Sequence, residues 1–268
     1  MADSRPLAVV TGASAGIGAA YARRLAAEGY DLVLVARRRE RLEALAGELR
    51  ARHGVEVEAL PADLTQDDEL KAVEDRITRA ENLEFLLNNA GFGAAGWFYK
   101  TSLESHDAMH RLHVLATLRL THAALRRMTA RGRGAVVNVS SVAAFVTRPG
   151  TTSYYATKAW IVCFTEGLYL ELKAGHMPVR VQALCPGYTV TEFHDVMGFD
   201  RKLIPASLWM TAEDVVEASL RGLARGRLIV VPGWRYKLVV LLLRLLPRPL
   251  LHAAVRLAPA RFGPETRV

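Results

Sequence analysis

The chain has 268 residues, of which 51% are hydrophobic, and a formal net charge of +8 at pH 7. This length allows one or two domains with a sizeable core, and no zinc-ligand spacing, RNA-binding signature or long basic arm points to nucleic acid. The N-terminus lacks the pattern of a secretory signal, and no apolar run reaches the roughly 18 residues of a membrane-spanning helix. Because the two cysteines, Cys163 and Cys185, provide no disulfide framework, we expect a cytoplasmic protein.

Short apolar runs alternate along the chain with amphipathic stretches. The apolar runs predict buried strands at 7–11, 31–36, 55–60, 84–89, 134–140, 179–185 and 228–232. The amphipathic stretches predict helices at 16–28, 39–52, 67–80, 104–130, 153–174 and 212–225. Strand–helix alternation of this kind is typical of an α/β fold with a parallel sheet and helices on both faces. Since no linker, repeat or composition break interrupts it, we expect a single doubly wound domain of seven strands over residues 1–233.

A glycine-rich turn, TGASAGIG at 11–18, follows the first predicted strand. Gly12, Gly16 and Gly18 lack a Cβ, which lets backbone N–H groups approach a pyrophosphate at the start of a helix. A turn of this kind is a weak motif by itself, but its position after the first strand of an alternating fold predicts a dinucleotide site.

The end of the second predicted strand indicates which dinucleotide binds. Ala36 stands where an acidic residue would bond the ribose 2′-hydroxyl of NAD, and Arg37 and Arg38 follow it. Because a guanidinium can bind a 2′-phosphate bidentately, this pattern predicts NADP(H). After the third strand, Asp63 is expected either to accept from the adenine amino group, with Leu64 packed nearby, or to cap a helix.

A set of three residues in the second half of the chain predicts acid–base chemistry. Tyr154 and Lys158 are four residues apart and therefore share one helix face. A tyrosine with the ordinary pKa of about 10 is a poor acid–base at neutral pH, and a neighbouring ammonium lowers that pKa. Ser141 ends a predicted strand and can donate to the same oxygen, so the three predict proton transfer to a carbonyl that receives a hydride.

These motifs resemble those of the short-chain dehydrogenase/reductase family, in the family's order, over residues 7 to about 232. The resemblance rests on TGxxxGIG at 11–18, NNAG at 88–91, the serine at 141, YxxxK at 154–158 and PGxxxT at 186–191. It implies a single-domain Rossmann fold, NAD(P)-linked oxidoreduction of carbonyl or hydroxyl groups, and a homodimer or homotetramer.

The resemblance also implies a role for each matching residue. It implies that Tyr154 is the catalytic acid/base, that Ser141 orients the substrate, and that Lys158 holds the nicotinamide ribose and lowers the tyrosine pKa. The implied cofactor contacts are Gly12, Ser14, Gly16, Ile17, Gly18, Arg37, Arg38, Asp63, Leu64, Asn88, Asn89, Ala90, Gly91, Tyr154, Lys158, Pro186, Gly187, Thr189 and Thr191.

The main departure from the family pattern is His113, in the segment HRLHVLATLRLTH at 110–122. The family usually has an asparagine there, which is thought to hold a water that connects the lysine to solvent. An imidazole can hold water and can itself carry protons. Three interpretations follow: His113 completes the catalytic relay, an impaired relay slows turnover, or the chain is an NADP-binding protein with little turnover. Since no carboxylate or cysteine pattern supports His106 and His110, we expect no metal site.

The expected substrate pocket is apolar, because the stretches 92–100 and 192–210 are rich in aromatic, Met and Leu residues. We therefore expect an NADPH-dependent reductase of an apolar ketone or aldehyde, or the reverse dehydrogenase. The tail 234–268 is expected to be a basic, apolar helical extension interrupted by Pro247 and Pro249. Its segment 236–258 is expected to pack on the domain or on a sister subunit. The alternative is an anionic membrane surface, with a lipid (3-oxoacyl or steroid-like) substrate.

Overall fold

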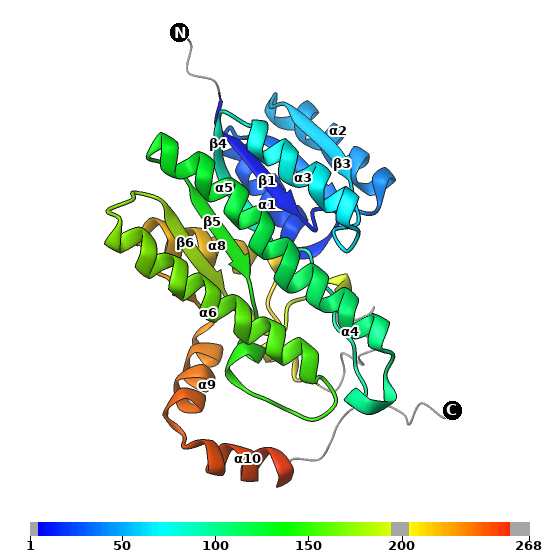
Figure 1. The fold of residues 1–268 in the computed structure, drawn as a ribbon, viewed down its shortest axis with the longest axis vertical. Coiled ribbons are helices and arrows are strands. Elements are labelled where there is room, and N and C mark those ends of the chain that lie inside the picture. Colours follow the sequence, from blue (N-terminus) through cyan, green and yellow to red (C-terminus); the bar gives the residue numbers. More distant parts are fainter. Residues whose placement is uncertain (1–4, 194–203, 258–268) are drawn as a thin grey trace.

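The computed structural model describes residues 5–193 and 204–257, which form one twisted sheet covered by helices on both faces (Figure 1). The sheet has seven parallel strands in the order β3-β2-β1-β4-β5-β6-β7. Their bounds are β1 Leu7–Thr11, β2 Asp31–Ala36, β3 Val57–Pro61, β4 Leu83–Asn88, β5 Ala135–Val139, β6 Arg180–Leu184 and β7 Ile229–Val230. The predicted doubly wound Rossmann fold is confirmed.

The helices divide between the two faces of the sheet. Their bounds are α1 Gly16–Ala27, α2 Arg39–His53, α3 Asp67–Arg79, α4 Leu103–His110, α5 Thr117–Arg131, α6 Thr152–Ala174 and α8 Ala212–Ala224. One core packs α1, α2 and α8 on the sheet, and the other packs α3, α5 and α6. Neighbouring strand residues enter opposite cores, as Val9 and Val10 of β1 do, because successive side chains of a strand point to opposite faces.

All of these element ends lie within two residues of the predicted ones, and the last strand is shortened most. The sequence predicts a strand over 228–232, but only Ile229 and Val230 pair with β6. The chain then reaches Pro232, which has no N–H to donate to a ladder, and Gly233, whose φ of 77° turns it into the next helix.

The predicted helix 104–130 is continuous in the structure but contains a π-helical segment. This segment, η2 at Arg111–Ala116, lies between α4 and α5. A π turn inserts one extra residue and so rotates the side chains that follow it, and such turns are frequent at functional sites. His113 belongs to this segment and is 1% exposed.

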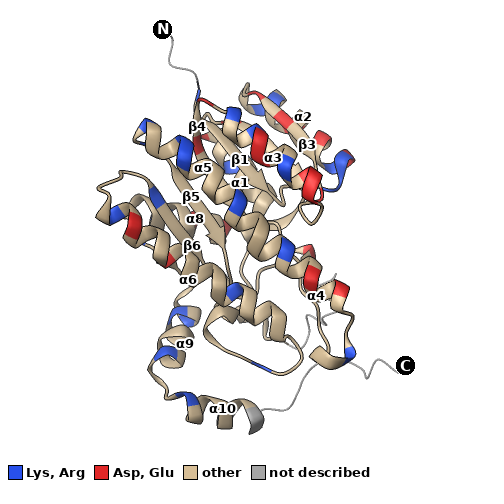
Figure 2. Cartoon of the chain, viewed as in Figure 1, with Lys and Arg blue, Asp and Glu red and all other residues tan. Residues whose placement is uncertain are grey.

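The tail forms two helices, α9 at Trp234–Leu245 and α10 at Arg248–Leu257, which Figure 2 shows with Lys and Arg but without Asp or Glu. On the inner face of α9, Tyr236 and Val240 are buried. Its outer face exposes an apolar stripe at helical spacing, formed by Trp234, Leu238, Leu241, Leu242 and Leu245. Within the described residues, no helix combines the length and the apolar character that crossing a membrane requires.

A buried amide network joins β4, β5 and α6. The Nδ2 of Asn88 donates to Thr121 Oγ1 at 2.9 Å and to Asn138 Oδ1 at 2.8 Å, and the Nδ2 of Asn138 donates to Thr165 Oγ1 at 3.1 Å. Asn138 and Thr165 are fully buried. Among the described residues Asn88 Oδ1 has no partner, whereas the bond from Asn138 to Thr165 joins the end of β5 to α6.

We predict that Asn138→Ala lowers the free energy of unfolding by about 2–4 kcal/mol, because it removes the fully buried amide that links Asn88 to Thr165 and leaves a cavity in its place. Chemical denaturation measures this loss. The matched control is Asn82→Ala, which removes one exposed hydrogen bond, to Arg5 O. A loss no larger than that of the control would contradict the structural role of the network.

Candidate active site

The three predicted catalytic residues meet where β5 ends and α6 begins. Ser141 follows β5 by two residues, and its hydroxyl lies close enough to that of Tyr154, in the first turn of α6, to influence the tyrosine pKa. One turn further along α6, Lys158 donates from Nζ to Val139 O at 2.9 Å, and this Nζ lies 5.7 Å from the centre of the Tyr154 ring. The structure therefore brings two hydroxyls and one ammonium together.

Burial shifts the pKa values of the tyrosine and the lysine in opposite directions. It raises the pKa of Tyr154 to about 12, although the interaction with Ser141 acts against the shift. It lowers the pKa of Lys158 to about 8. Desolvation of the phenolate therefore outweighs the interaction with Ser141, and the lowering of the tyrosine pKa by Lys158 stays a prediction. At neutral pH the tyrosine is a phenol that can donate a proton, and most of the lysine is charged.

His113 has hydrogen-bond partners at both ring nitrogens. Its Nε2 lies 3.2 Å from the backbone N of Phe92, which can only donate, and its Nδ1 lies 2.9 Å from Thr157 Oγ1. The Thr157 hydroxyl in turn donates to the backbone oxygen of Tyr154 at 3.0 Å. This pattern assigns the proton of a neutral imidazole to Nδ1. The pKa of His113 lies well below its usual value, first because of burial and then because of the charge on Lys158.

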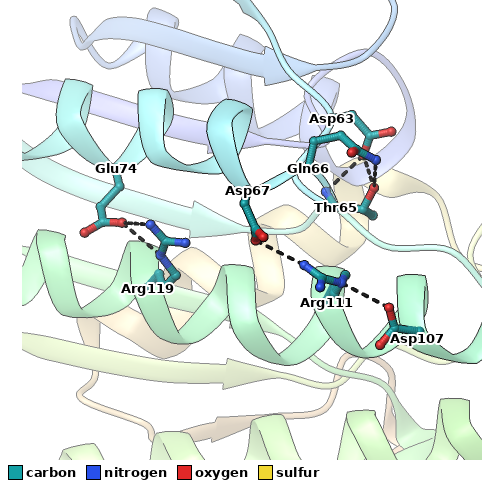
Figure 3. A network of polar contacts seen from close by, with 8 residues as sticks. All are labelled: Asp63, Thr65, Gln66, Asp67, Glu74, Asp107, Arg111 and Arg119. Carbon is teal, nitrogen blue, oxygen red and sulfur yellow. Dashed lines mark hydrogen bonds and ion pairs between the residues drawn. The ribbon is translucent and has the colours of Figure 1, made fainter.

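Ion pairs hold the helix that carries His113 against α3, as Figure 3 shows. Arg111 contacts Asp107 within its own helix at 3.0 Å and Asp67 of α3 at 3.1 Å. Arg119 of α5 makes a further contact with α3: its guanidinium donates to Glu74 at 2.6 and 2.9 Å. The Arg111 contacts are exposed and add little stability, whereas the Arg119–Glu74 contact is partly buried. The contacts link the segments on both sides of the π-helical turns to α3.

The residues present fit the phosphates of a dinucleotide at the glycine turn. Gly12 has a φ of 66°, and a Cβ there would lie 2.6 Å from Asn89 Nδ2, while a Cβ at Gly18 would overlap the carbonyl of Gly12. The helix that follows has no side-chain cap, so its first N–H groups are available to an anion. Thr11 Oγ1 accepts from the backbone N of Asn89 at 2.9 Å and of Ala90 at 3.1 Å, which holds the segment before Gly91 against the turn.

The arginine that borders this turn is Arg38. It donates to Ser14 Oγ at 2.9 and 3.2 Å and pairs with Glu192 at 2.7 Å. Beside this pair lies a cleft of about 510 Å³, lined in part by Gly16 and Thr191. Two other expected cofactor contacts differ from Arg38. The side chain of Arg37 is exposed, and that of Ile17 packs on the core.

Asp63 shapes a turn before α3, as Figure 3 shows. Its Oδ1 accepts from the backbone N of Thr65 at 3.0 Å and from Thr65 Oγ1 at 2.8 Å, and its Oδ2 lies 4.0 Å from Arg37. The helix cap itself is Gln66, so the expectation that Asp63 caps this helix is wrong by three residues. Leu64 is buried beside this turn.

The loop 186–191 lies against Ser141. The Pro186 carbonyl accepts from Val142 N at 3.0 Å and from Ser141 Oγ at 3.4 Å, and Thr189 Oγ1 donates to Gly187 O at 3.1 Å. The expected substrate segment 192–210 lies partly outside the described residues. In the other expected segment, 92–100, Trp97, Phe98 and Tyr99 are exposed.

The sequence did not predict that Tyr236 of α9 supports this loop. Its hydroxyl accepts from Tyr188 N at 3.0 Å and donates to Leu208 O at 2.7 Å. A Cβ on Gly187 would overlap its ring. The sequence also did not predict the role of Thr157, which links His113 to Tyr154. Both contacts join residues more than forty positions apart, and no local pattern signals them.

Comparison with known proteins identifies the family. The family model of short chain dehydrogenase matches residues 6–200. A 7beta-hydroxysteroid dehydrogenase of Collinsella aerofaciens is 31% identical over 229 residues, which cover 85% of this chain and 86% of that protein.

Solved structures agree over nearly the whole chain. A short-chain dehydrogenase from Sphingobium yanoikuyae in complex with NADPH is 39% identical, with a TM-score of 0.81, and covers 95% of this chain and 98% of its own. The bulky-bulky ketone specific alcohol dehydrogenase from Comamonas testosteroni is 35% identical, with a TM-score of 0.78, and covers 96% of this chain and all of its own, 100%. The chain therefore belongs to the short-chain dehydrogenase family of nicotinamide-dependent enzymes and is an oxidoreductase that acts on carbonyl or CH–OH groups.

Proposed function

We propose that the protein is an NADPH-dependent reductase of apolar ketones or aldehydes. The observation that carries the proposal is the meeting of the Tyr154 phenol, the Ser141 hydroxyl and the Lys158 ammonium at the end of β5. NADPH would supply the hydride to the carbonyl carbon. Tyr154 gives its proton to the carbonyl oxygen, and Ser141 donates a hydrogen bond to the same oxygen. The Lys158 ammonium stabilises the negative charge that develops there.

The preference for NADPH rests on Ala36 and Arg38. At the end of β2, Ala36 places no carboxylate where it would repel a 2′-phosphate, and Arg38 lies on Ser14 at the edge of the glycine turn. The Sphingobium yanoikuyae relative, which was solved with NADPH, supports the same choice. For the substrate, the bulky-bulky ketone specific relative from Comamonas testosteroni supports a large apolar carbonyl compound.

A second candidate is an NADP-binding protein with little turnover, and the contacts of His113 favour it. Both ring nitrogens already have partners in the protein, so the imidazole offers no free lone pair to a relay water. We retain the reductase as the proposal because Ser141, Tyr154 and Lys158 are all in place.

The proposed assembly is a homodimer or homotetramer. The apolar stripe of α9 supports it, because an exposed patch of this kind usually marks a contact surface. The alternative contact is an anionic membrane surface, which the basic residues of α9 and α10 would favour.

We predict that Tyr154→Phe lowers kcat for ketone reduction by about 10²- to 10⁴-fold, because it removes the proton donor. NADPH oxidation with a panel of apolar ketones and aldehydes measures the loss. The matched control is Tyr155→Phe, the neighbouring ring at 6.2 Å, which should change kcat by less than about threefold. Equal losses in both variants, or no turnover by the wild type despite tight NADPH binding, would contradict the reductase.

We predict that Arg38→Ala raises the Kd for NADPH by about 10- to 100-fold, because it removes charge-assisted hydrogen bonds to the 2′-phosphate. The Kd for NADH, which lacks this phosphate, should change by less than about threefold. Fluorescence titration measures both affinities, with Arg39→Ala as the control because Arg39 is exposed and pairs with Glu43. An equal loss of affinity for NADPH and NADH would show that Arg38 does not bind the 2′-phosphate.

We predict that kcat/KM for reduction is level around neutral pH and falls as the pH rises above about 8. The Lys158 pKa is lowered to about 8, so the ammonium is present below this pH and lost above it, while Tyr154, with a pKa raised to about 12, stays protonated. Burial holds His113 neutral, so it contributes no step near its usual value. Rates at saturating NADPH across this range are the measurement, and a step between about pH 6 and 7 would count against the neutral histidine.

A further inference from the structure

A carboxylate from the segment after β6 binds two arginines at the start of α2. Glu192 Oε2 lies 2.7 Å from Arg38 Nη1, and Glu192 Oε1 pairs with Arg41 Nη1. Glu192 is 154 residues from Arg38 and 151 from Arg41 along the chain, so the fold brings these groups together. The two arginines, Arg38 first, lower the pKa of the Glu192 carboxyl, which is therefore charged at neutral pH. One carboxylate thus bridges two guanidinium groups.

This contact lies at the edge of the proposed dinucleotide site. Arg38 also donates to Ser14 Oγ of the glycine turn at 2.9 and 3.2 Å. Next to Glu192, the side chain of Thr191 packs on the same turn, because a Cβ on Gly16 would lie 2.8 Å from Thr191 Cγ2. Glu192 also lines the cleft of about 510 Å³ beside the turn. Since clefts of about 300–1,000 Å³ accept whole ligands, a ligand can reach the ion pairs from this side.

The neighbours of Glu192 are held in place on both sides. Val190 N donates to Met210 O at 2.9 Å, two residues before Glu192. On the other side, the ring of Phe193 lies 5.9 Å from the ring of Tyr154. The carboxylate itself is half-exposed at the end of a flexible side chain. It can therefore leave the two arginines by rotation of its own side chain.

Arginine binds carboxylates and phosphates through the same fork of N–H donors. Glu192 therefore uses the donors of Arg38 that the 2′-phosphate of NADPH would need. A phosphate monoester carries almost two negative charges at neutral pH, so the carboxylate also repels it at short range. Exposed ion pairs are weak, which means that a phosphate with the higher charge can take the place of the carboxylate.

We propose that Glu192 is a specificity-determining residue that competes with the 2′-phosphate of NADPH for Arg38 and Arg41, an inference that rests on the proposed preference for NADPH. Arg41 thereby becomes a second arginine for the phosphate, beside Arg38. Glu192 lowers the affinity for NADPH and leaves the affinity for NADH unchanged, because NADH has only a hydroxyl at this position. Its carboxylate thus sets how strongly the protein distinguishes the two cofactors.

Glu192→Gln tests the competition, because it removes the charge and keeps the size of the side chain. The Kd for NADPH should fall about three- to tenfold, and the Kd for NADH should change by less than about twofold. Fluorescence titration measures both affinities. Adenosine 2′,5′-bisphosphate and AMP, which differ by the 2′-phosphate and lack the nicotinamide, should show the same contrast.

Glu43→Gln is the matched control, because it removes the same charge from an exposed carboxylate of α2 that pairs with Arg39. It should leave both Kd values unchanged. In a variant that combines Arg38→Ala with Arg41→Ala, the added substitution Glu192→Gln should change the Kd for NADPH by less than about twofold, because its partners are gone. Thermal unfolding confirms that each variant is folded.

The outcomes separate competition from other roles of Glu192. A higher Kd for NADPH in Glu192→Gln would overturn the proposal, because the carboxylate would then position the arginines for the phosphate. An unchanged Kd, or equal changes for NADPH and NADH, would overturn it as well.

The titrations need no turnover, so they do not depend on whether the protein reduces ketones. If the wild type binds NADPH no more tightly than NADH, the proposed preference for NADPH fails. The role of Glu192 is still supported in that case if Glu192→Gln raises the ratio of the Kd for NADH to the Kd for NADPH about three- to tenfold. A ratio that stays the same would overturn both.

Discussion

The active site depends on how the end of β5 is bound to α6. Consecutive residues of that strand end each contact the helix: Asn138 donates to Thr165 Oγ1, the Val139 carbonyl accepts from Lys158 Nζ, and Ser140 Oγ donates to Lys158 O at 2.7 Å. These atoms are buried, so each bond must be made in the folded state. The strand end therefore fixes both the position and the rotation of α6. Ser141 and Tyr154 meet because the residues immediately before Ser141 already join the end of β5 to α6.

The same burial determines the charges in the site. It keeps Tyr154 protonated, brings the Lys158 pKa down to about 8, and leaves His113 neutral. An imidazolium at position 113 would repel the Lys158 ammonium inside a region of low dielectric, so the neutral ring is the form that the site tolerates. The hydrogen bonds from Phe92 and to Thr157 hold this form. The histidine thus connects the segment after β4 to α6 without adding a charge.

The sequence predicted the fold closely because the fold depends on local pattern. Apolar runs and amphipathic stretches define β1, β2 and most helices, and the glycine turn and the Tyr154–Lys158 spacing are local as well. What the sequence could not predict depends on contacts between distant segments. The raised tyrosine pKa comes from burial, which the spacing to Lys158 does not reveal. The π-helical segment adds one residue to a turn whose amphipathic pattern is that of an ordinary helix. The tyrosine of α9 that supports the loop 186–191 lies 48 residues from its contact.

Through this last contact, the tail helix α9 supports the loop 186–191 of the candidate site. The inner face of α9 holds Tyr236 against Gly187 and Tyr188, and Gly187 has no Cβ because the ring occupies that position. The outer face of the same helix carries the apolar stripe from Trp234 to Leu245. In the proposed assembly, a sister subunit that covers this stripe would contact the same helix that supports the loop 186–191. The proposed assembly and the loop 186–191 would therefore share one supporting helix, α9.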